Sequence, residues 1–484
     1  MKISCQKSLS KNDHFECIVL PFWEGPVEAA SFSVFKELIA KPLESGDFRG
    51  KLGETLFLYK GEKRLLLVGL GKQDSVTSES VRRSLATAVR AAISKKVKTL
   101  HLVTPQVRKL TKEELLRAVS DAVFLTNYNF TLLKHDTLRD NPPTLLDQIV
   151  FIGDVDTSLL KKAHIIASGV HRVRDLVNNN ADDVNPKLLA DFAKKSGLKT
   201  KILGKKEIEQ EKMGLLLAVN RGSVQDPALI ILSHQGNPKN KEHIVLVGKG
   251  ITYDTGGLNV KPADNMLTMK CDMAGAATVL AAVQVAGQLD LKVNVTAIVP
   301  ATENAIDSKS YKQGDVYHSK SGKTVEITHT DAEGRLVLAD ALTYAIEHLK
   351  PTTLIDIATL TGGVVVALGE DIAGLFSNNE ALTQNLLRSS ETTGESLWRL
   401  PLPHDYKEML KSEIADLVNS AGRYASAITA ALFLQEFCGG LPWAHLDVAG
   451  TAYLSKPKFY NTTKATGFGL RLLVDFLEKR ASSS

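Results

Sequence analysis

Residues 244–250 read Ile-Val-Leu-Val-Gly-Lys-Gly, an apolar run of strand length that ends in a lysine between two glycines. A helix rich in small residues is predicted next, over 275–289, and residues 292–299 have the composition of another strand. The order repeats downstream, where helical spacing over 336–349 precedes a strand at 353–357. Such repeated strand-helix-strand order predicts right-handed crossovers and a parallel sheet. We therefore expect an α/β fold, with a three-layer α/β/α arrangement in this larger, C-terminal part.

The first third of the chain also alternates between strand-like and helix-like segments. Buried strands are predicted at 17–21, 65–69, 99–103 and 148–152, and amphipathic helices at 78–95 and 112–125. This alternation favours a parallel or mixed sheet covered on both faces. A helix over 157–176 reads as a connector. The predicted organisation is a smaller N-terminal α/β domain (1–155), a linker helix (156–178) and a larger C-terminal domain (179–484).

Composition excludes several classes of protein. The chain has 484 residues, is 44% hydrophobic and 23% charged, and carries a formal net charge of +5, which is typical of a globular enzyme with a solvated surface. Its cysteines (Cys5, Cys17, Cys271 and Cys438) are far apart and form no CxxC pair, which favours reduced thiols. No signal-peptide core and no membrane-spanning apolar run is present. We expect a cytoplasmic protein without a membrane or nucleic-acid partner.

Acidic and basic side chains follow the predicted strands at the places where an α/β sheet forms its sites. Lys249 and Asp254 come after the strand at 244–247, whereas Asp331 and Glu333 come directly before the helix at 336–349. Ligands bind beyond the carboxyl ends of the strands in open α/β sheets. The topology therefore predicts that these sequence-distant groups share one rim of the sheet.

The chemistry that these residue types favour is divalent-metal binding. Several carboxylates at one place repel one another unless a cation compensates them, and hard oxygen donors suit divalent ions. The candidates are Asp254, Asp272, Asp331 and Glu333, together with Lys249, which can act as a ligand only as a neutral amine. No histidine has the HExxH spacing, so a carboxylate-rich site shared by two metals fits better than a single structural zinc.

Other kinds of site fit less well. The GxG runs at 68–72 and 247–250 do not continue to GxGxxG, which disfavours a nucleotide site. No GxSxG elbow is present, and Cys271 has no base signature beside it. Cys271 is instead interpreted as a small packed residue next to a metal ligand.

Taken together, these segments resemble the cytosolic leucine aminopeptidase family. Residues 247–277 resemble its first metal segment, and residues 330–336, Thr-Asp-Ala-Glu-Gly-Arg-Leu, match its signature. Further similar segments lie at 174–178, 359–362, 443–450 and 465–469. The resemblance covers roughly the last two-thirds of the chain, and its motifs are long and specific. In the N-terminal third, the resemblance is limited to an α/β pattern that is compatible with the family.

The resemblance implies two adjacent divalent metals, Mn²⁺ or Zn²⁺, and a bicarbonate ion. Lys249 and Asp272 would bind one metal, Asp331 the other, and Asp254 and Glu333 would bridge them. The same comparison implies catalytic side chains at Lys261 and Arg335, bicarbonate binding at Arg335, Gly334 and Leu360, and a homohexamer whose sites face an internal cavity.

The activity that the resemblance implies is removal of N-terminal residues from peptides with a free amine. The cations would activate the attacking water, Lys261 and metal would stabilise the oxyanion, and bicarbonate on Arg335 would carry the proton. Met269 resembles the family's hydrophobic first-residue pocket, which favours leucine-like N-termini and aminoacyl amides. His329 stands where the signature usually has Asn, close to the expected binding position of the substrate's first side chain.

Two other functions stay open from sequence alone. Some bacterial members of the family bind DNA as regulators, although the mild charge and the lack of a basic stripe offer little for this. A dinuclear hydrolase with another amide substrate, such as cysteinylglycine, is the other alternative. The residues also leave the metal open among manganese, magnesium and zinc.

Overall fold

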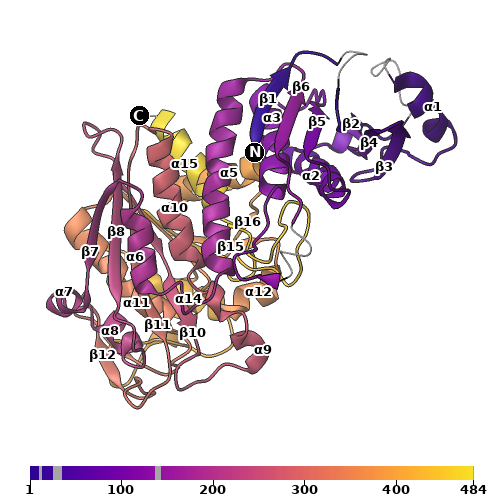
Figure 1. Cartoon of the computed structure of the whole chain (residues 1–484). Coiled ribbons are helices and arrows are strands. Elements are labelled where there is room, and N and C mark those ends of the chain that lie inside the picture. The colour runs from indigo at the N-terminus through magenta and orange to yellow at the C-terminus, as the bar shows by residue number, and fades with distance from the viewer. Residues whose placement is uncertain (10–13, 26–34, 137–142, 483–484) are drawn as a thin grey trace. The chain divides into compact units, whose positions relative to one another are not determined.

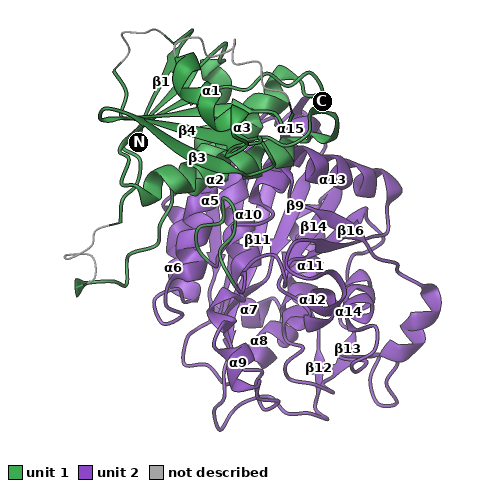
Figure 2. Ribbon diagram, turned by 90° about the vertical axis from the view of Figure 1, so that its right-hand side faces the viewer, with its two compact units in different colours: residues 1–168, 456–463 green, residues 169–455, 464–484 purple. Residues whose placement is uncertain are grey.

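The computed structural model describes residues 1–9, 14–25, 35–136 and 143–482. It consists of two compact units, which Figure 2 shows in different colours. Unit 1 comprises residues 1–168 and 456–463, and unit 2 comprises residues 169–455 and 464–484. The division falls inside helix α5 (Thr157–Asn178), which forms over the segment predicted as a connector. The predicted domain borders at 155 and 178 stay a prediction.

Unit 1 is built on a mixed sheet with helices packed against it (Figure 1). The strands predicted at 17–21, 65–69, 99–103 and 148–152 are all present, and β3 pairs antiparallel with β4. In spatial order, the strands are β1 (Lys2–Gln6), β6 (Gln148–Ile152), β5 (Thr99–Val103), β2 (Cys17–Phe22), β4 (Lys63–Gly69) and β3 (Thr55–Lys60). Within the residues that the structure describes, the α-helices of this unit, besides its part of α5, are α1 (Lys36–Glu44), α2 (Ser78–Ser94) and α3 (Lys112–Thr126).

Local sequence explains where the two long helices of unit 1 begin. The Thr77 hydroxyl accepts a hydrogen bond from the Ser80 backbone N–H at 3.1 Å, and the Ser80 hydroxyl accepts one from the Thr77 backbone N–H at 2.9 Å. Thr111 and Glu114 form the same reciprocal pair at the start of α3. Each pair satisfies backbone donors that a helix N-terminus would otherwise leave unpaired.

Unit 2 is built on a longer mixed sheet, which within the described residues has nine strands. Its central strands are parallel: β18 (Trp443–Asp447), β14 (Thr353–Ala358), β9 (Ile244–Gly248) and β11 (Asn294–Asn304). The remaining strands are β16 (Leu397–Arg399) and β15 (Ala373–Ser377) on one side, β8 (Ala228–Gln235) and β7 (Lys199–Leu203) on the other, and β10 (Gly250–Asp254), which pairs with β11.

The expectation of a parallel sheet is confirmed for the four central strands of unit 2 and wrong where β8 and β15 flank them. β8 runs antiparallel to β11, and β15 runs antiparallel to β18. The connection from β8 to β9, residues 236–243, contains no helix. Because parallel strands need a crossover of about a dozen residues or more, so short a connection leaves β8 and β9 running in opposite directions.

Helices cover both faces of this sheet, which makes the predicted three layers. Val245 and Val247 of β9 belong to one apolar cluster with α11 (Gly334–Leu349), α8 (Gly214–Asn220) and α14 (Ser426–Gln435). Gly248 lies against the other face, where α10 (Ala274–Gln288) packs. A Cβ on Gly248 would lie 2.6 Å from the carbonyl oxygen of Gly275, so glycine lets helix and strand approach closely.

The other elements of unit 2 surround these layers. A small sheet is formed by β12 (Val316–His318), β13 (Thr324–Glu326) and β17 (Leu417–Val418). The further helices are α6 (Pro186–Lys194), α7 (Lys205–Gln210), α9 (Ala263–Met266), α12 (Gly362–Leu368), α13 (Glu380–Thr393) and α15 (Leu470–Ser482).

Candidate metal centre

The carboxyl ends of the central strands in unit 2 bring the predicted residues together. Lys249 directly follows β9, Asp254 is the last residue of β10, and Thr359 directly follows β14. The Lys249 backbone N–H donates to the Ile357 carbonyl at 3.1 Å, which fixes the lysine beside the end of the neighbouring strand. Glu333 immediately precedes α11 and reaches the same rim. The predicted convergence is therefore observed.

Lys249 is the centre of a fully buried set of charges. Its Nζ lies 2.8 Å from Asp272 Oδ2 and 2.8 Å from Glu333 Oε1. The same ammonium donates to the Thr359 carbonyl at 3.0 Å. The Thr359 hydroxyl in turn donates to Asp272 Oδ1 at 2.7 Å. Both oxygens of Asp272 are thereby oriented by groups that come from other elements.

Lys261 makes the second pair of charge contacts. Its Nζ lies 2.8 Å from Asp254 Oδ2 and 2.5 Å from Asp331 Oδ1. Asp254 Oδ1 accepts from the Asn304 side-chain amide at 2.8 Å and from the Gly256 N–H at 2.9 Å. The side chains of Lys261 and Asp331 are 14% and 26% exposed, whereas that of Asp254 is buried. This side of the cluster is therefore the one that solvent reaches.

The donor set fits divalent cations. Ligand oxygens of Asp254, Asp272 and Glu333 all lie within 4.8 Å of one another, and all three residues are buried. With Asp331 they make four carboxylates, which face the ammonium groups of Lys249 and Lys261. Within the described part of the chain, Glu333 Oε2 is buried without a hydrogen-bond donor. An unpaired buried carboxylate oxygen in an excess of negative charge is what a bound cation would satisfy.

The protonation equilibria show how poorly the cluster is neutralised by the protein alone. Burial, reinforced by the charge of Glu333, raises the pKa of Asp254. Burial raises the pKa of Asp272 as well, although Lys249 opposes it. Burial would lower the pKa of Lys249, but the charges of Asp272, Glu333 and Asp254 outweigh burial and raise it. A raised aspartate pKa favours the neutral acid, and a raised lysine pKa favours the ammonium. Both shifts reduce the net negative charge of the cluster, which a divalent ion does more effectively.

A hydrogen-bonded pair of residues joins the two loops that carry predicted metal ligands. Thr330 donates its backbone N–H to Asn259 Oδ1 at 2.7 Å and accepts from the Asn259 N–H at 2.8 Å through its hydroxyl. The Thr330 hydroxyl also donates to the Gly256 carbonyl at 2.7 Å. Gly256 has a φ of +88°, a conformation that residues with a side chain rarely adopt. The loop with Lys261 and the loop with Asp331 are therefore held against each other by hydrogen bonds.

Arg335 lies in the first turn of α11, with 6% of its surface exposed. Its Nη1 donates to the carbonyl of Asn419 at 2.8 Å. Burial lowers the pKa of Arg335 to about 10, against the opposing charges of Glu333 and Asp447. The guanidinium remains a cation at neutral pH, so it can hold an anion but cannot accept a proton.

The two residues predicted to bind bicarbonate with Arg335 lie near the same rim. Gly334 begins α11 and faces the Lys249 side chain. Leu360 follows β14, and its backbone N–H donates to Asp447 Oδ1 at 3.1 Å. Asp447 Oδ2 also accepts from the Thr361 hydroxyl at 2.7 Å, which holds this loop in place. The bicarbonate assignment stays a prediction.

His329 occupies its position in a way that an asparagine could reproduce. Its Nδ1 accepts from the backbone N–H of Asp331 at 3.3 Å. Burial and the nearby Arg335 lower the pKa of His329, which favours the neutral ring with an acceptor nitrogen. Asparagine side chains make the same bond to the N–H two residues on. The departure from the signature therefore preserves the local turn.

Sequence reasoning missed roles for Asn304, Asn419 and Asp447. Asn304 ends β11 and donates to both Asp254 and the Thr330 carbonyl. Its place at the carboxyl end of a central strand is a signal that could have identified it. Asn419 and Asp447 act through loops that are distant in sequence, and no local pattern marks them.

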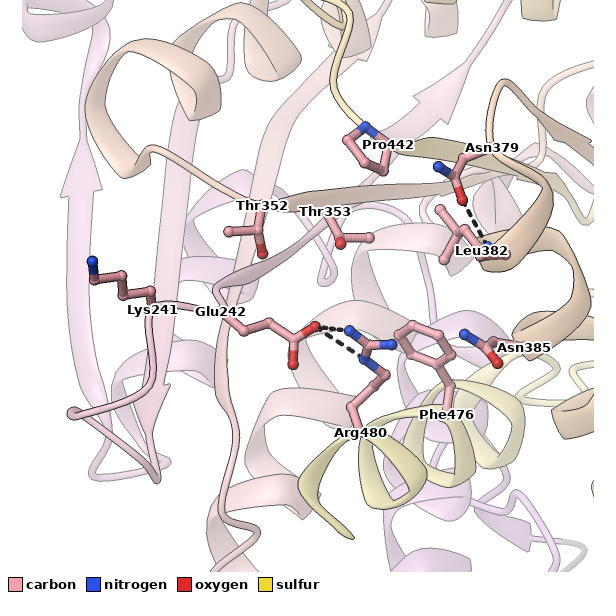
Figure 3. Close-up of a pocket in the computed structure, with 11 residues that line it drawn as sticks. Lys241, Glu242, Thr352, Thr353, Asn379, Leu382, Asn385, Pro442, Phe476 and Arg480 are labelled. Atoms are coloured by element: carbon pink, nitrogen blue, oxygen red, sulfur yellow. Dashed lines mark hydrogen bonds and ion pairs between the residues drawn. The ribbon is translucent and has the colours of Figure 1, made fainter. Parts of the chain in front are cut away.

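Two other candidate sites are separate from this centre. The pocket in Figure 3 encloses about 390 Å³ and is lined by Glu242, Thr353 and Pro442. These residues stand at the amino ends of β9, β14 and β18, which is the opposite edge of the sheet. The acidic group of Glu211, Glu347 and His348 already has a cation, because Lys320 Nζ lies 2.7 Å from Glu211 and 2.9 Å from Glu347.

Two further observations concern the cysteines and the helices of the described residues. All four cysteines are free thiols, as expected. None of the helices in the described ranges is both long and apolar enough to cross a membrane.

Comparison with known proteins matches nearly the whole chain. Residues 171–474 match the family described as "Cytosol aminopeptidase family, catalytic domain", and residues 19–137 match its N-terminal domain. A probable cytosol aminopeptidase of Protochlamydia amoebophila is 47% identical over 493 aligned positions, covering 99% of both chains. One from Chlamydia abortus is also 47% identical and covers 98% of both. Among solved structures, the bottromycin maturation enzyme BotP in complex with Mn is similar, with a TM-score of 0.86, 31% identity, and coverage of 96% of this chain and 99% of that one.

Proposed function

This chain belongs to the cytosol aminopeptidase family, and we propose that it is a dinuclear metal enzyme which prefers leucine-like N-terminal residues. The coarser activity, a metal-dependent aminopeptidase and thus a hydrolase, follows from the family. The observation that carries the finer proposal is the buried group of Asp254, Asp272 and Glu333, whose ligand oxygens lie within 4.8 Å of one another. Carboxylates that lie this close together could each give ligand oxygens to two neighbouring cations.

The proposed assignment gives each side chain one duty. Lys249, as a neutral amine, and Asp272 would hold one ion, Asp331 would hold the other, and the buried carboxylates Asp254 and Glu333 would contribute ligands to both. When bound, such ions polarise the scissile carbonyl and acidify water. Manganese is the metal we propose, because the similar BotP structure contains Mn. Zinc remains an alternative, since it accepts carboxylate and nitrogen ligands.

Lys261 is proposed to stabilise the oxyanion that develops on the scissile carbonyl. Its ammonium is held at 2.8 Å from Asp254 and 2.5 Å from Asp331, on the part of the cluster that solvent reaches. Burial would lower the pKa of Lys261, but the charges of Asp254 and Glu333 outweigh burial and raise it. A fixed cation next to developing negative charge lowers the barrier without reorganisation.

Arg335 is proposed to hold a bicarbonate ion together with Gly334 and Leu360. The support is chemical, since the buried guanidinium stays protonated and cannot itself remove a proton from water. An anion retained beside it would supply the missing base. The fixed position of Arg335 against the Asn419 carbonyl supports this assignment.

We also propose a preference for leucine-like residues, a homohexamer and a cytoplasmic location. Met269, half-buried and close to Asp272, supports an apolar pocket for the first side chain. Exposed large apolar residues in the described part of unit 2, such as Val366, Trp398 and Tyr424, support contacts between subunits. The cytosol aminopeptidase names of the relatives support the location.

The decisive experiment is restoration of activity in metal-stripped protein. Manganese, zinc, magnesium or cobalt is added back, and hydrolysis is measured on a panel of aminoacyl amides that includes leucyl amide and cysteinylglycine. N-acetyl-leucyl amide is the matched control, because it lacks only the free amine. We expect two bound ions per chain, fastest turnover of leucyl amide and none of the acetylated control. Turnover of cysteinylglycine alone, or activity that saturates with one ion, would contradict the proposal.

A further inference from the structure

The loop that carries Asp331 and Glu333 has little regular structure of its own. It runs from the end of β13 to the start of α11, and residues 327–333 are neither strand nor helix. Glu333 must nevertheless hold its carboxylate 2.8 Å from Lys249 Nζ in a fully buried place. Something outside the loop therefore has to define its path.

Asn419 supplies that external support. It follows β17, which pairs in parallel with β13, and its own N–H donates to the Glu326 carbonyl at 2.9 Å. The residue is completely buried. Its Oδ1 accepts from the backbone N–H groups of Thr328 at 2.9 Å and His329 at 3.2 Å.

The amide nitrogen of the same side chain binds the other side of the loop. Asn419 Nδ2 donates to the His329 carbonyl at 2.7 Å and to the Ala332 carbonyl at 3.4 Å. The Asn419 backbone carbonyl accepts from Arg335 Nη1 at 2.8 Å. One residue therefore contacts the loop before Asp331, the loop before Glu333 and the guanidinium beyond them.

We propose that Asn419 is the positioning residue that sets the Asp331 and Glu333 carboxylates for metal binding. It lies outside the set of ligands and acts through the backbone of residues 328–332. Only an amide offers an acceptor and a donor at these two places, since aspartate would direct a carboxylate oxygen at two carbonyls and alanine would contact neither. The inference deepens the proposed function and rests on it, because it assigns Asn419 to the same metal centre.

A purely structural role would predict a different outcome, and Asn220 provides the comparison. Asn220 is also a buried amide, 5% exposed, and donates to the Gln225 carbonyl at 2.8 Å and to the Thr302 hydroxyl at 3.0 Å. Neither of these two partners belongs to the loop of Asp331 and Glu333. Its replacement by alanine should lower stability and leave metal affinity unchanged.

The experiment compares Asn419→Ala, Asn419→Asp and Asn220→Ala with the parent protein. Metal-free samples are titrated with Mn²⁺ by calorimetry, and kcat and KM for leucyl amide are measured at saturating Mn²⁺. Removal of a group that orients metal ligands typically costs about 10–100-fold in affinity or activity. We expect a loss of that size in Mn²⁺ affinity and kcat for both Asn419 variants, and parent values for Asn220→Ala.

Parent-like Mn²⁺ affinity and kcat in a folded Asn419→Ala protein would overturn the inference. If that variant does not fold, Asn419→Asp decides, because it has the same shape and keeps the acceptor bonds. Affinity loss of equal size in Asn220→Ala would also overturn it, since the effect would then be general destabilisation. If the parent binds Mn²⁺ but hydrolyses no aminoacyl amide, the proposed function fails while the affinity comparison still tests Asn419.

Discussion

Gly334 has no room for a side chain because the side chain of Lys249 crosses it. A Cβ at Gly334 would lie 2.6 Å from Lys249 Cε and 2.8 Å from Nζ. The glycine between Glu333 and Arg335 is therefore a steric requirement of the lysine that is proposed to bind metal. It also explains why helix α11 begins with a glycine directly after Glu333.

Replacement of Gly334 by alanine should displace the Lys249 ammonium and disable the centre. The methyl group would occupy the path of the lysine, and its ion pairs with Asp272 and Glu333 would lengthen or break. We expect kcat for leucyl amide to fall about 100-fold, since misplacement by about 1 Å costs that much. Gly204→Ala is the matched control, because a Cβ there meets only the flexible end of Glu207 at 3.3 Å. Equal activity in both variants would contradict the argument.

Lys261→Met should separate catalysis from metal binding. The substitution removes a cation that lies 2.8 Å from Asp254 and 2.5 Å from Asp331, which leaves the carboxylates more negative. We expect Mn²⁺ affinity to stay equal or increase, while kcat falls about 10²–10³-fold through loss of oxyanion stabilisation. Calorimetry and steady-state kinetics measure the two effects independently.

Two further variants serve as controls for the Lys261→Met experiment. Glu333→Gln removes a buried carboxylate and should weaken Mn²⁺ binding by at least about tenfold. Lys292→Met removes an exposed lysine paired with Asp290 and should change neither quantity. A Lys261→Met protein with much weaker Mn²⁺ binding would show that Lys261 supports the metals rather than the reaction.

His329→Asn should keep activity, and His329→Ala should not. The Asp331 N–H donates to His329 Nδ1 at 3.3 Å. An asparagine side chain would offer a replacement acceptor, whereas alanine would offer none. Loss of one such bond corresponds to about 0.5–1.5 kcal/mol, or about a 2- to 12-fold change. We expect kcat/KM for leucyl amide to fall within that range for His329→Ala only. Equal losses in both variants would show that the imidazole itself has a role.

The stability of the metal-free protein should depend on pH through Asp340. Burial raises the pKa of Asp340 to about 7, although backbone N–H groups of Lys320, Leu216 and Leu215 oppose the shift. The folded protein therefore binds more protons than the unfolded chain between about pH 4 and pH 7. Stability from the protonated group is complete below about pH 4 and is lost as the pH rises through 7. The difference amounts to up to about 4 kcal/mol.

Thermal unfolding of the parent and Asp340→Asn proteins measures this effect. The variant cannot titrate at this position, and comparison at each pH cancels the contribution of every other group. We expect its Tm to rise relative to the parent as the pH increases from about 4 to 7. A difference that does not vary with pH would contradict the prediction.

Some elements of the fold could be predicted from the sequence alone and others could not. The apolar runs of β9, β11 and β14 and the helical spacing of α11 were readable because each pattern is local and periodic. The antiparallel direction of β8 and β15, each the second strand from an end of the sheet, was not readable, since pairing direction depends on how each connection returns the chain. Likewise Asn304 carried a recognisable signal at a strand end, whereas Asn419 carried none.

The amino-acid sequence by itself determined the residue types of the metal centre and the rim on which they meet. Lys249, Asp254 and Glu333 were identifiable because strand ends and helix starts are set by local patterns. Only the tertiary structure decided which lysine faces which carboxylate and that Asn419 spans the loop before Glu333. Apart from Lys261 and Asp254, which are 7 positions apart, these relationships join residues 84 to 90 positions apart, and they follow from long-range packing rather than from neighbours in the chain.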